Sequence, residues 1–283
     1  MKTYAIGDVH GRADLLAVLL SQIEQENSSD PNGYRVIFLG DIIDRGPDSR
    51  PAMDLVAGEL KQRSGSQLIL GNHEEFLLLF LDRPDKRDII FDHWMTNGGA
   101  AAASSYGLDI MRPYPRIEEA HETLMGLLTA HPEHIDAMRA AASFIRDDDH
   151  VFVHAGLRPG VEIEKQTNKD LRTIRADFLG SDFDFGPIVV HGHTVTASRQ
   201  PEIYDNRIAL DTGAESSSRL SALAIGPNET RYFLQTSAGQ AVEKIEPLDL
   251  RSDRARPWSA RYLQRSPGDA VSSYGDPSSQ AAA

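Results

Sequence analysis

Residues 2–11 read KTYAIGDVHG, a short apolar run that ends in glycine and is followed by polar side chains. The same order returns in residues 35–46, RVIFLGDIIDRG, and in residues 67–74, QLILGNHE. Two later stretches place histidine after the run, VFVHAG at residues 151–156 and IVVHGHT at residues 188–194. Short runs rich in Val, Ile, Leu and Phe without polar alternation are typical of strands buried on both faces. We therefore expect a buried strand in each stretch, followed by a polar loop.

Two amphipathic segments separate the first three of these strands. Residues 14–23 and residues 51–60 both carry apolar side chains at helical spacing. The resulting order of strand, helix, strand, helix, strand indicates a largely parallel sheet with right-handed crossovers.

The middle of the chain, residues 75–150, has a more helical character. Its pattern predicts helices over residues 75–81, 118–129 and 132–145, with Pro132 suited to the first turn of the last one. We interpret this region as a helical cap inserted within a catalytic domain that covers residues 1–250.

The end of the chain changes pattern twice. Residues 207–210, 220–225 and 230–234 predict late antiparallel strands, with a turn at residues 226–228. From residue 251 onward the composition shifts to Ser, Pro, Gly and Ala, which predicts a disordered tail over residues 251–283. The fold class is therefore mixed α and β.

Composition excludes several classes of function. The sequence has no cysteine, which excludes disulfides, zinc-thiolate sites and cysteine nucleophiles. With 42 Asp and Glu against 29 Lys and Arg, its formal net charge is −13, which argues against nucleic acid or a membrane surface as partner. No apolar run approaches the roughly 20 residues that cross a bilayer. We expect a cytoplasmic protein that holds any phosphate with local groups.

The polar loops after the strands carry carboxylates, histidines and an asparagine. Because the carboxyl ends of parallel strands meet at one edge of a sheet, these side chains can converge although they lie far apart in sequence. Asp8 and His10 are two residues apart, so in extended backbone both side chains leave on the same face. Such a set without thiolates suits Mn²⁺, Fe or Zn²⁺.

Taken together, the motifs Gly-Asp-x-His-Gly, Gly-Asp-x-x-Asp-Arg-Gly, Gly-Asn-His-Glu, His-Ala-Gly and Gly-His-Thr resemble the signature of one enzyme family. It is the phosphoprotein phosphatase branch of the metallophosphoesterases. The resemblance runs from Gly7 to about Gly213 and is strongest to small bacterial and phage Ser/Thr protein phosphatases, which are related to bacterial diadenosine tetraphosphatases. It implies a four-layer α/β/β/α sandwich of two mixed sheets with helices outside.

The resemblance also implies a site with two divalent metal ions, with Mn²⁺ favoured and Fe or Zn²⁺ as alternatives. The implied ligands are Asp8 and His10 for the first ion, Asp41 for both, and Asn72, His154 and His193 for the second. In this family-based mechanism, a hydroxide held between the ions attacks phosphorus in line, and no covalent intermediate is needed.

Other residues of the motifs receive roles by the same resemblance. His73 is the candidate general acid that protonates the leaving group, and Asp44 would orient it. Arg45 offers a planar fork for phosphate oxygens, which Asn72 would also contact. Arg175 stands where relatives carry a second phosphate-binding arginine.

Three residues near the motifs are open to more than one interpretation. Arg172 is the alternative to Arg175 as the second phosphate-binding arginine. Glu74 is interpreted as a helix cap or a support of the site. His191 would be a partner of the metal ligands or a buried residue at a strand end, with a slight preference for the former. The five histidines outside the motifs are assigned no role.

The favoured activity is hydrolysis of phosphate monoesters, as a Ser/Thr protein phosphatase acting on phosphoproteins or phosphorylated small molecules. The alternative is a dinucleoside tetraphosphate hydrolase that uses the same site. Relatives of the second kind read Gly-Asn-His-Asp and carry an Ala-Arg-Gly variant, whereas this chain has Glu74 and Asp44 at those places. The oligomeric state is left open.

Two further functions are disfavoured. A nuclease of this superfamily would usually end in Gly-His-x-His, but here His193 is followed by Thr194 and Val195. A catalytically dead binding module should have lost a metal ligand, the general acid or the phosphate arginine, and each of these is present.

Overall fold

The computed structural model describes residues 1–147, 149–226, 230–237 and 241–252, and their strands form two mixed sheets of six strands each. In spatial order the first sheet consists of β11 (Val242–Ile245), β10 (Arg231–Thr236), β9 (Ser221–Ile225), β1 (Lys2–Ile6), β2 (Tyr34–Phe38) and β3 (Gln67–Leu68). The second consists of β12 (Leu248–Asp249), β7 (Glu202–Ile203), β8 (Arg207–Ala209), β6 (Ile188–His191), β5 (His150–Val153) and β4 (Phe144–Arg146).

Strand directions follow the sequence prediction in the first third of the chain. β1 is parallel to β2, and β2 is parallel to β3. Among the late strands, β9 and β10 pair antiparallel as predicted. The prediction holds in part for β8, which lies in the other sheet and is antiparallel to the short strand β7 but parallel to β6. Local sequence carries no signal for such a choice of partner.

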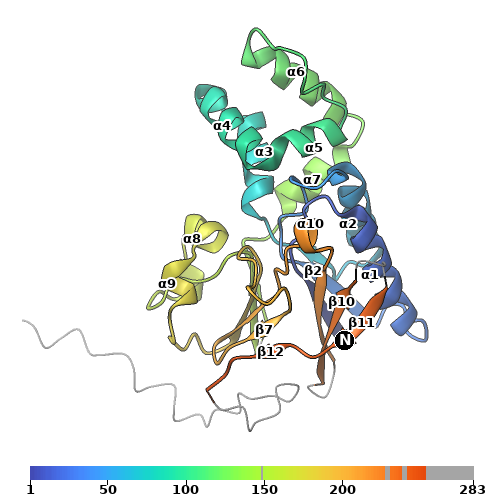
Figure 1. Ribbon diagram of the computed structural model, residues 1–283, viewed down its shortest axis with the longest axis vertical. Coiled ribbons are helices and arrows are strands. Elements are labelled where there is room, and N and C mark those ends of the chain that lie inside the picture. The colour runs from blue at the N-terminus through green and yellow to red at the C-terminus, as the bar shows by residue number, and fades with distance from the viewer. Residues whose placement is uncertain (148, 227–229, 238–240, 253–283) are drawn as a thin grey trace, which may run out of the picture.

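The two sheets pack face to face, and helices cover both outer faces (Figure 1). Ile37 and Leu39 of the first sheet lie in one apolar cluster with Phe152 and Val190 of the second. The first sheet is covered on its outer face by α1 (Ala13–Glu26) and α2 (Ser49–Gln62), and the second by the short helices α8 (Asn168–Thr173) and α9 (Ala176–Leu179). This is the predicted four-layer α/β/β/α architecture.

A group of helices rises above the carboxyl ends of the strands (Figure 1). It comprises α3 (Asn72–Asp82), the 3₁₀ turn η1 (Pro84–Lys86), α4 (Arg87–Trp94), the π-helical turn η2 (Met95–Gly99), α5 (Ala100–Ser105), α6 (Ile117–Leu128) and α7 (Pro132–Ala140). Two small elements lie elsewhere, the 3₁₀ turn η3 (Ile163–Lys165) and α10 (Ala214–Ser217). No helix in the described part of the chain is long and apolar enough to cross a membrane.

The helix predicted over residues 132–145 ends at Ala140, and Phe144–Arg146 forms strand β4 instead. The backbone of Ala142 pairs with the chain around β3, because its N–H donates to Leu68 O and its carbonyl accepts from Leu70 N, both at 2.9 Å. Pairing of the backbone with the edge of the first sheet beside β3 thus ends the helix. The predicted turn at residues 226–228 falls largely outside the described residues. Of the predicted tail over residues 251–283 only Arg251 and Ser252 are described, and Arg251 is buried and bonded to Asp249.

Candidate metal centre

The loops that follow β1 and β2 are bonded to each other at the top of the first sheet. The N–H of His10 donates to Asp41 O at 2.9 Å, and the N–H of Gly46 donates to His10 O at 3.1 Å. A Cβ added to Gly46 would lie only 2.1 Å from His10 O, so glycine is required where the two loops cross. The contact fixes the side chains of both loops relative to one another.

Backbone strain is concentrated at this place. Seven described residues other than glycine have positive φ, and five of them belong to the predicted site: His10, Asp41, Asp44, Arg45 and His193. Such conformations are costly for residues with a Cβ and are retained where the surrounding structure imposes them, often at functional sites.

The carboxylate of Asp41 lies among three imidazole rings. Its Oδ2 is 3.4 Å from Nε2 of His154, 3.6 Å from Nε2 of His10 and 3.8 Å from Nε2 of His73. Two groups of potential ligand atoms result, one with His10 and His73 and the other with His154 and His193, and Asp41 belongs to both. This is the arrangement in which one carboxylate could join two metal ions.

The far nitrogens of two of these rings are held by backbone carbonyls. Nδ1 of His10 lies 3.0 Å from Ile43 O, and Nδ1 of His154 lies 2.8 Å from Leu39 O. Since a carbonyl only accepts, each Nδ1 donates a proton, which leaves the Nε2 atom of each ring facing Asp41. Metal-binding histidines are commonly oriented in this way.

The remaining predicted ligands lie beside this centre. Oδ1 of Asn72 is 3.1 Å from Nε2 of His154. The carboxylate of Asp8 accepts the backbone N–H of His193 at 3.0 and 3.1 Å. Nε2 of His193 is buried and has no hydrogen-bond partner among the described residues, which leaves a lone pair for a ligand. The six predicted ligands thus lie around one centre, with Asp8 outside the two donor groups that share Asp41.

Electrostatics favour a cation at this place. Burial lowers the pKa of His10 to about 3 and that of His193 to about 2, so both imidazoles are neutral. Burial alone would raise the pKa of Asp41, but the charges of His154 and His73 outweigh it and hold that pKa well below its usual range. Neutral imidazole and ionised carboxylate are the forms that bind divalent metals. Burial and the charges of Asp211 and Asp41 raise the pKa of Asp8, a repulsion that a cation would relieve.

His73 is held by a buried carboxylate and an indole. Its Nδ1 donates to Oδ2 of Asp44 at 2.7 Å, and Nε1 of Trp94 donates to both oxygens of Asp44 at 3.0 Å. Burial lowers the pKa of His73, but the charges of Asp41 and Asp44 outweigh it and raise that pKa above its usual value. Sequence analysis missed Trp94, whose only signal is that a buried indole N–H needs an acceptor.

Arg45 directs its guanidinium into the same centre. Its two terminal nitrogens lie 2.9 Å from Nε2 of His10 and 3.1 Å from Nε2 of His73. Its backbone N–H donates to Gly98 O at 3.1 Å, and a Cβ on Gly98 would lie 2.7 Å from the Arg45 side chain. The π-helical turn η2 therefore fixes this exposed arginine in place.

The two candidates for a second phosphate-binding arginine have different environments. Arg175 is exposed and donates to Oγ1 of Thr194 at 3.0 Å, within the last motif, and its charge contributes to lowering the pKa of His193. Arg172 is buried and pairs with Glu75. The structure brings Arg175 to the site and engages Arg172 elsewhere.

Glu74 supports the loop that carries Asp41. Its carboxylate accepts the backbone N–H groups of Asp41 at 2.8 Å, Ile42 at 2.7 Å, Ile43 at 3.1 Å and Gly71 at 3.1 Å. Burial and the charge of Asp41 raise the pKa of Glu74 to about 7, against the opposing effect of the Ile43 N–H. Its interpretation as a helix cap and a support of the site is confirmed.

Two further residues clarify the surroundings of the site. The buried ring of His191 packs edge-on against Phe178 at 5.1 Å, and its Nδ1 lies 3.0 Å from Gly192 O. These contacts favour a buried strand-end histidine over the slightly preferred role as partner of the metal ligands. Asp211 is a buried carboxylate whose charge helps to raise the pKa of Asp8.

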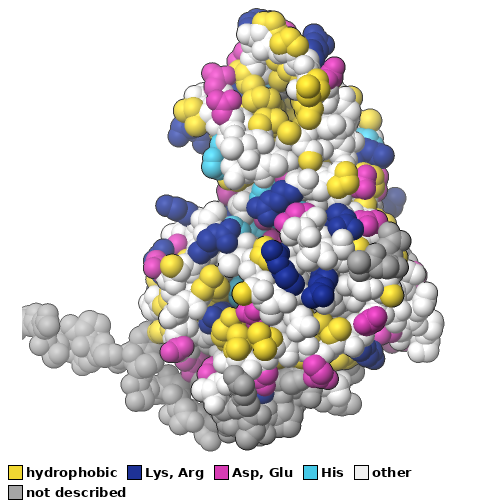
Figure 2. All heavy atoms as spheres, in the orientation of Figure 1, with side chains coloured by type: hydrophobic (Ala, Val, Ile, Leu, Met, Phe, Trp, Pro, Cys, Tyr) yellow, Lys and Arg dark blue, Asp and Glu magenta, His cyan; other side chains and the backbone are white. Residues whose placement is uncertain are grey.

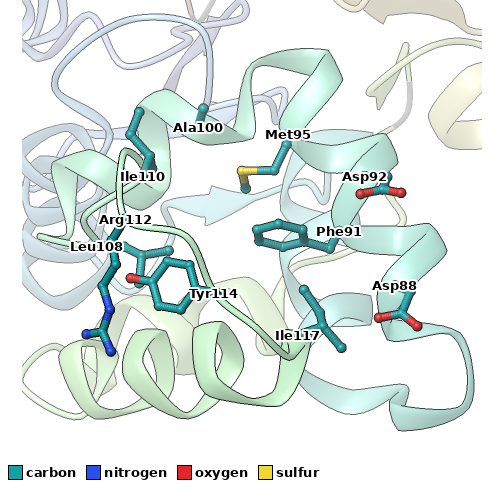
Figure 3. Close-up of a pocket in the computed structure, with 10 residues that line it drawn as sticks. All are labelled: Asp88, Phe91, Asp92, Met95, Ala100, Leu108, Ile110, Arg112, Tyr114 and Ile117. Carbon is teal, nitrogen blue, oxygen red and sulfur yellow. The ribbon is translucent and has the colours of Figure 1, made fainter.

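A separate cavity of about 580 Å³ opens in the helical region. Figure 3 shows the side chains of Phe91, Met95 and Tyr114 along its wall. Helix α4 contributes to both the cavity and the metal centre, because Phe91 lines the cavity and Trp94, one turn later, donates a hydrogen bond to Asp44. On the face drawn in Figure 2, hydrophobic side chains gather on the helical region, and Lys and Arg side chains gather between it and the sheets.

The sequence matches the family model of the calcineurin-like phosphoesterases over residues 1–199. Similar proteins include the asymmetrical bis(5'-nucleosyl)-tetraphosphatase PrpE of Geobacillus sp. (strain WCH70), 26% identical over 88% of this chain and 100% of that protein. The protein of the same name from Anoxybacillus flavithermus is 24% identical over 86% of this chain and 98% of its own length. A symmetrical bis(5'-nucleosyl)-tetraphosphatase of Nitrosomonas europaea is 30% identical over 58% of this chain and 48% of that protein.

Two solved structures share the fold. A putative diadenosine tetraphosphatase superposes with a TM-score of 0.52 at 20% identity and covers 87% of this chain and 93% of its own. A protein serine/threonine phosphatase from Saccharomyces cerevisiae superposes with a TM-score of 0.54 at 12% identity and covers 88% of this chain and 80% of its own.

The role of Glu74 can be tested by stability. Replacing Glu74 with Ala leaves four backbone N–H groups without their acceptor, and each unsatisfied buried donor costs about 1–3 kcal/mol. We expect the free energy of unfolding, measured by urea titration, to fall by about 2 kcal/mol or more. Glu122→Ala, at an exposed position of α6, is the control, and an equal effect in both variants would contradict the role of Glu74.

Proposed function

The chain belongs to the calcineurin-like phosphoesterase family, and from this premise we propose that it is a hydrolase that cleaves phosphate ester or anhydride bonds at two divalent metal ions. The observation that carries the proposal is the position of Asp41, whose one carboxylate lies within 4 Å of Nε2 atoms on both sides of the centre. Donors arranged around a shared carboxylate suit two ions better than one.

The residues present fit two such ions. In this proposal Asp8 and His10 hold the first, Asp41 joins both, and Asn72, His154 and His193 hold the second. The unpartnered Nε2 of His193 and the Nδ1 bonds of His10 and His154 support this assignment. Bound there, the ions would activate a water molecule and neutralise charge on the phosphoryl oxygens. Mn²⁺ is the first candidate, with Fe or Zn²⁺ as alternatives.

The protein groups then divide the remaining work. His73 keeps a proton more readily than His10, because Asp44 accepts from its Nδ1, whereas a neutral carbonyl holds His10. His73 therefore serves as the general acid for the leaving group, oriented by Asp44. Arg45 and Arg175 bind the phosphate oxygens from two sides of the centre, together with the Asn72 amide.

The substrate we favour is a dinucleoside tetraphosphate, the alternative of the sequence analysis. Two relatives that align over nearly their whole length carry bis(5'-nucleosyl)-tetraphosphatase names. The motif argument for a protein phosphatase rested on two residues, Glu74 and Asp44. Glu74 no longer supports it, because its carboxylate bonds to backbone N–H groups and not to His73. The difference between Glu and Asp at this position therefore concerns loop support rather than substrate choice.

The cavity of the helical region adds to this preference. Its wall includes the aromatic rings of Phe91 and Tyr114 and the apolar side chains of Met95 and Ile117 (Figure 3). Planar bases stack well on such rings. This space could therefore receive the nucleoside end of a substrate whose phosphates lie at the metal centre.

A Ser/Thr protein phosphatase remains the second candidate because of one contact. Asp44, absent from the Ala-Arg-Gly variant, accepts from His73 at 2.7 Å. A serine or threonine alkoxide is a strong base and needs a proton as it leaves, whereas a phosphate leaving group needs one far less. The His73–Asp44 pair is thus most useful for a phosphate monoester.

A direct comparison of substrates tests the preference. Metal-stripped protein is reconstituted with Mn²⁺, and kcat/KM is measured side by side for diadenosine tetraphosphate and a phosphothreonine peptide. We expect the dinucleotide to be preferred by about a hundredfold or more. A preference of that size for the peptide would replace the proposal with its second candidate, and activity on neither would refute both.

The His73→Asn variant tests the general acid. On a phosphothreonine peptide, kcat should fall by ~10²-fold or more, since the alkoxide leaves without a proton. On diadenosine tetraphosphate the loss should be smaller, because the leaving group is a weaker base. Metal content, measured by mass spectrometry, should stay unchanged. An equal loss of metal would instead make His73 a ligand, as its place near His10 and Asp41 permits.

A further inference from the structure

A second cluster of metal-type donors lies where α7 packs on α2. It consists of Asp54 on α2, His131 just before α7, and Glu133 and His134 in the first turn of α7. One donor atom from each residue lies within 4.8 Å of the others. The cluster shares no residue with the candidate metal centre, and sequence analysis assigned its histidines no role.

We propose that this cluster binds one divalent transition metal ion, Zn²⁺ or a similar cation, and that the ion fastens α7 to α2. Two imidazoles and two carboxylates form a donor set that Zn²⁺ accepts in four-coordinate sites. The two carboxylates carry the charge that balances the ion, and Asp54 pairs with Arg50 through Oδ2 at 3.1 Å, which leaves Oδ1 for the ion.

The orientation of His134 carries the argument. Its side chain is fully buried, and Nδ1 lies 2.9 Å from the hydroxyl of Tyr106. Nε2 lies 3.0 Å from Oδ1 of Asp54, which is ion-pair distance, and 3.9 Å from Oε1 of Glu133. A buried imidazole nitrogen that faces two carboxylates is an arrangement in which one cation can bind between the three groups.

The distances fit coordination. With bonds of about 2.0–2.1 Å from Zn²⁺ to nitrogen and oxygen, neighbouring ligand atoms of a tetrahedron lie about 3.3 Å apart. The two separations measured from Nε2 of His134 lie on either side of that value, so small side-chain rotations bring the atoms into place. Tyr106 holds the other nitrogen of the ring, as the partner of a metal-binding histidine usually does.

The site is open to solvent on one side. The side chains of Asp54 and Glu133 are 43% and 54% exposed, and His131 is half-buried. The ring of His131 stacks on that of His134 with centroids 5.1 Å apart and planes at 14°. An ion can therefore enter from solvent and bind Nε2 of His134, a buried donor whose ring is already held by Tyr106.

Binding here would stabilise the base of the helical region. Helix α7 leads from this region into β4, α2 belongs to the layer that covers the first sheet, and Tyr106 follows α5 directly. An ion bound only by the folded state raises its stability by an amount set by its concentration relative to Kd. The role is structural and separate from catalysis.

The test compares the Mn²⁺-loaded wild-type protein with His131→Ala and Asp54→Ala, both at partly exposed positions, and with Asp136→Ala, an exposed residue of α7 outside the cluster, as control. Each protein is dialysed against Zn²⁺, and total metal per chain is determined by mass spectrometry. The wild type and the control should hold one more equivalent than either cluster variant. Equal metal content in all four proteins would overturn the proposal.

Thermal unfolding gives a second readout on the same proteins. Zn²⁺ at about a hundred times its Kd should raise Tm in the wild type and in Asp136→Ala, and this increase should be absent in the two cluster variants. Activity should be the same in all four, because none of these residues belongs to the catalytic site. An equal Tm increase in the cluster variants would contradict the site even if metal content differed.

Discussion

A buried carboxylate needs compensating partners, and Asp41 is the carboxylate on which the rest of this structure depends. Removing a charge from water is costly unless hydrogen bonds and opposite charges surround it. Here the backbone N–H of His73 donates to Oδ1, three imidazole nitrogens surround Oδ2, and Glu74 fixes the backbone of the Asp41 loop. These partners come from loops that only the folded chain brings together. Burial makes the charge of Asp41 unfavourable in free energy without these neighbours, and it also makes this carboxylate suited to hold two cations.

The two-sheet architecture is what supplies those partners. His10 and Asp41 follow strands of the first sheet, whereas His154 and His193 follow strands of the second. The two halves of the centre meet only because the inner faces of the sheets pack against each other, with Ile37 against the apolar side chains of the facing sheet. Helix α3 then begins at the edge of the site and adds Asn72 and His73 from its first turn. Packing of the sandwich core therefore determines the geometry of the metal centre.

Much of this could be predicted from sequence, and the exceptions have a common cause. Buried strands followed by glycine and polar residues are local patterns, so the sequence predicted the parallel first third and the convergence of the polar loops that follow the strands. The chain from Ala141 to Ile145 was predicted as helix because the helical pattern is local, whereas the segment after β3 that pairs with Ala142 is distant in sequence. Trp94 was not predicted as a site residue, because no neighbouring residue in the sequence indicates its hydrogen bond to Asp44. Glu74 was given the correct supporting role but was also used to choose a substrate, which its bonds to backbone N–H groups do not support.

The central claim is that Asp41 joins two metal ions, and electron paramagnetic resonance of the protein reconstituted with Mn²⁺ tests it most directly. Two Mn²⁺ ions that share one carboxylate are magnetically coupled, and their spectrum differs from that of isolated ions. The account predicts two ions per chain with a coupled spectrum in the wild type, and loss of the coupling together with at least one ion in Asp41→Asn. A coupled pair that persists in Asp41→Asn, or a wild type that shows only isolated Mn²⁺, would contradict it.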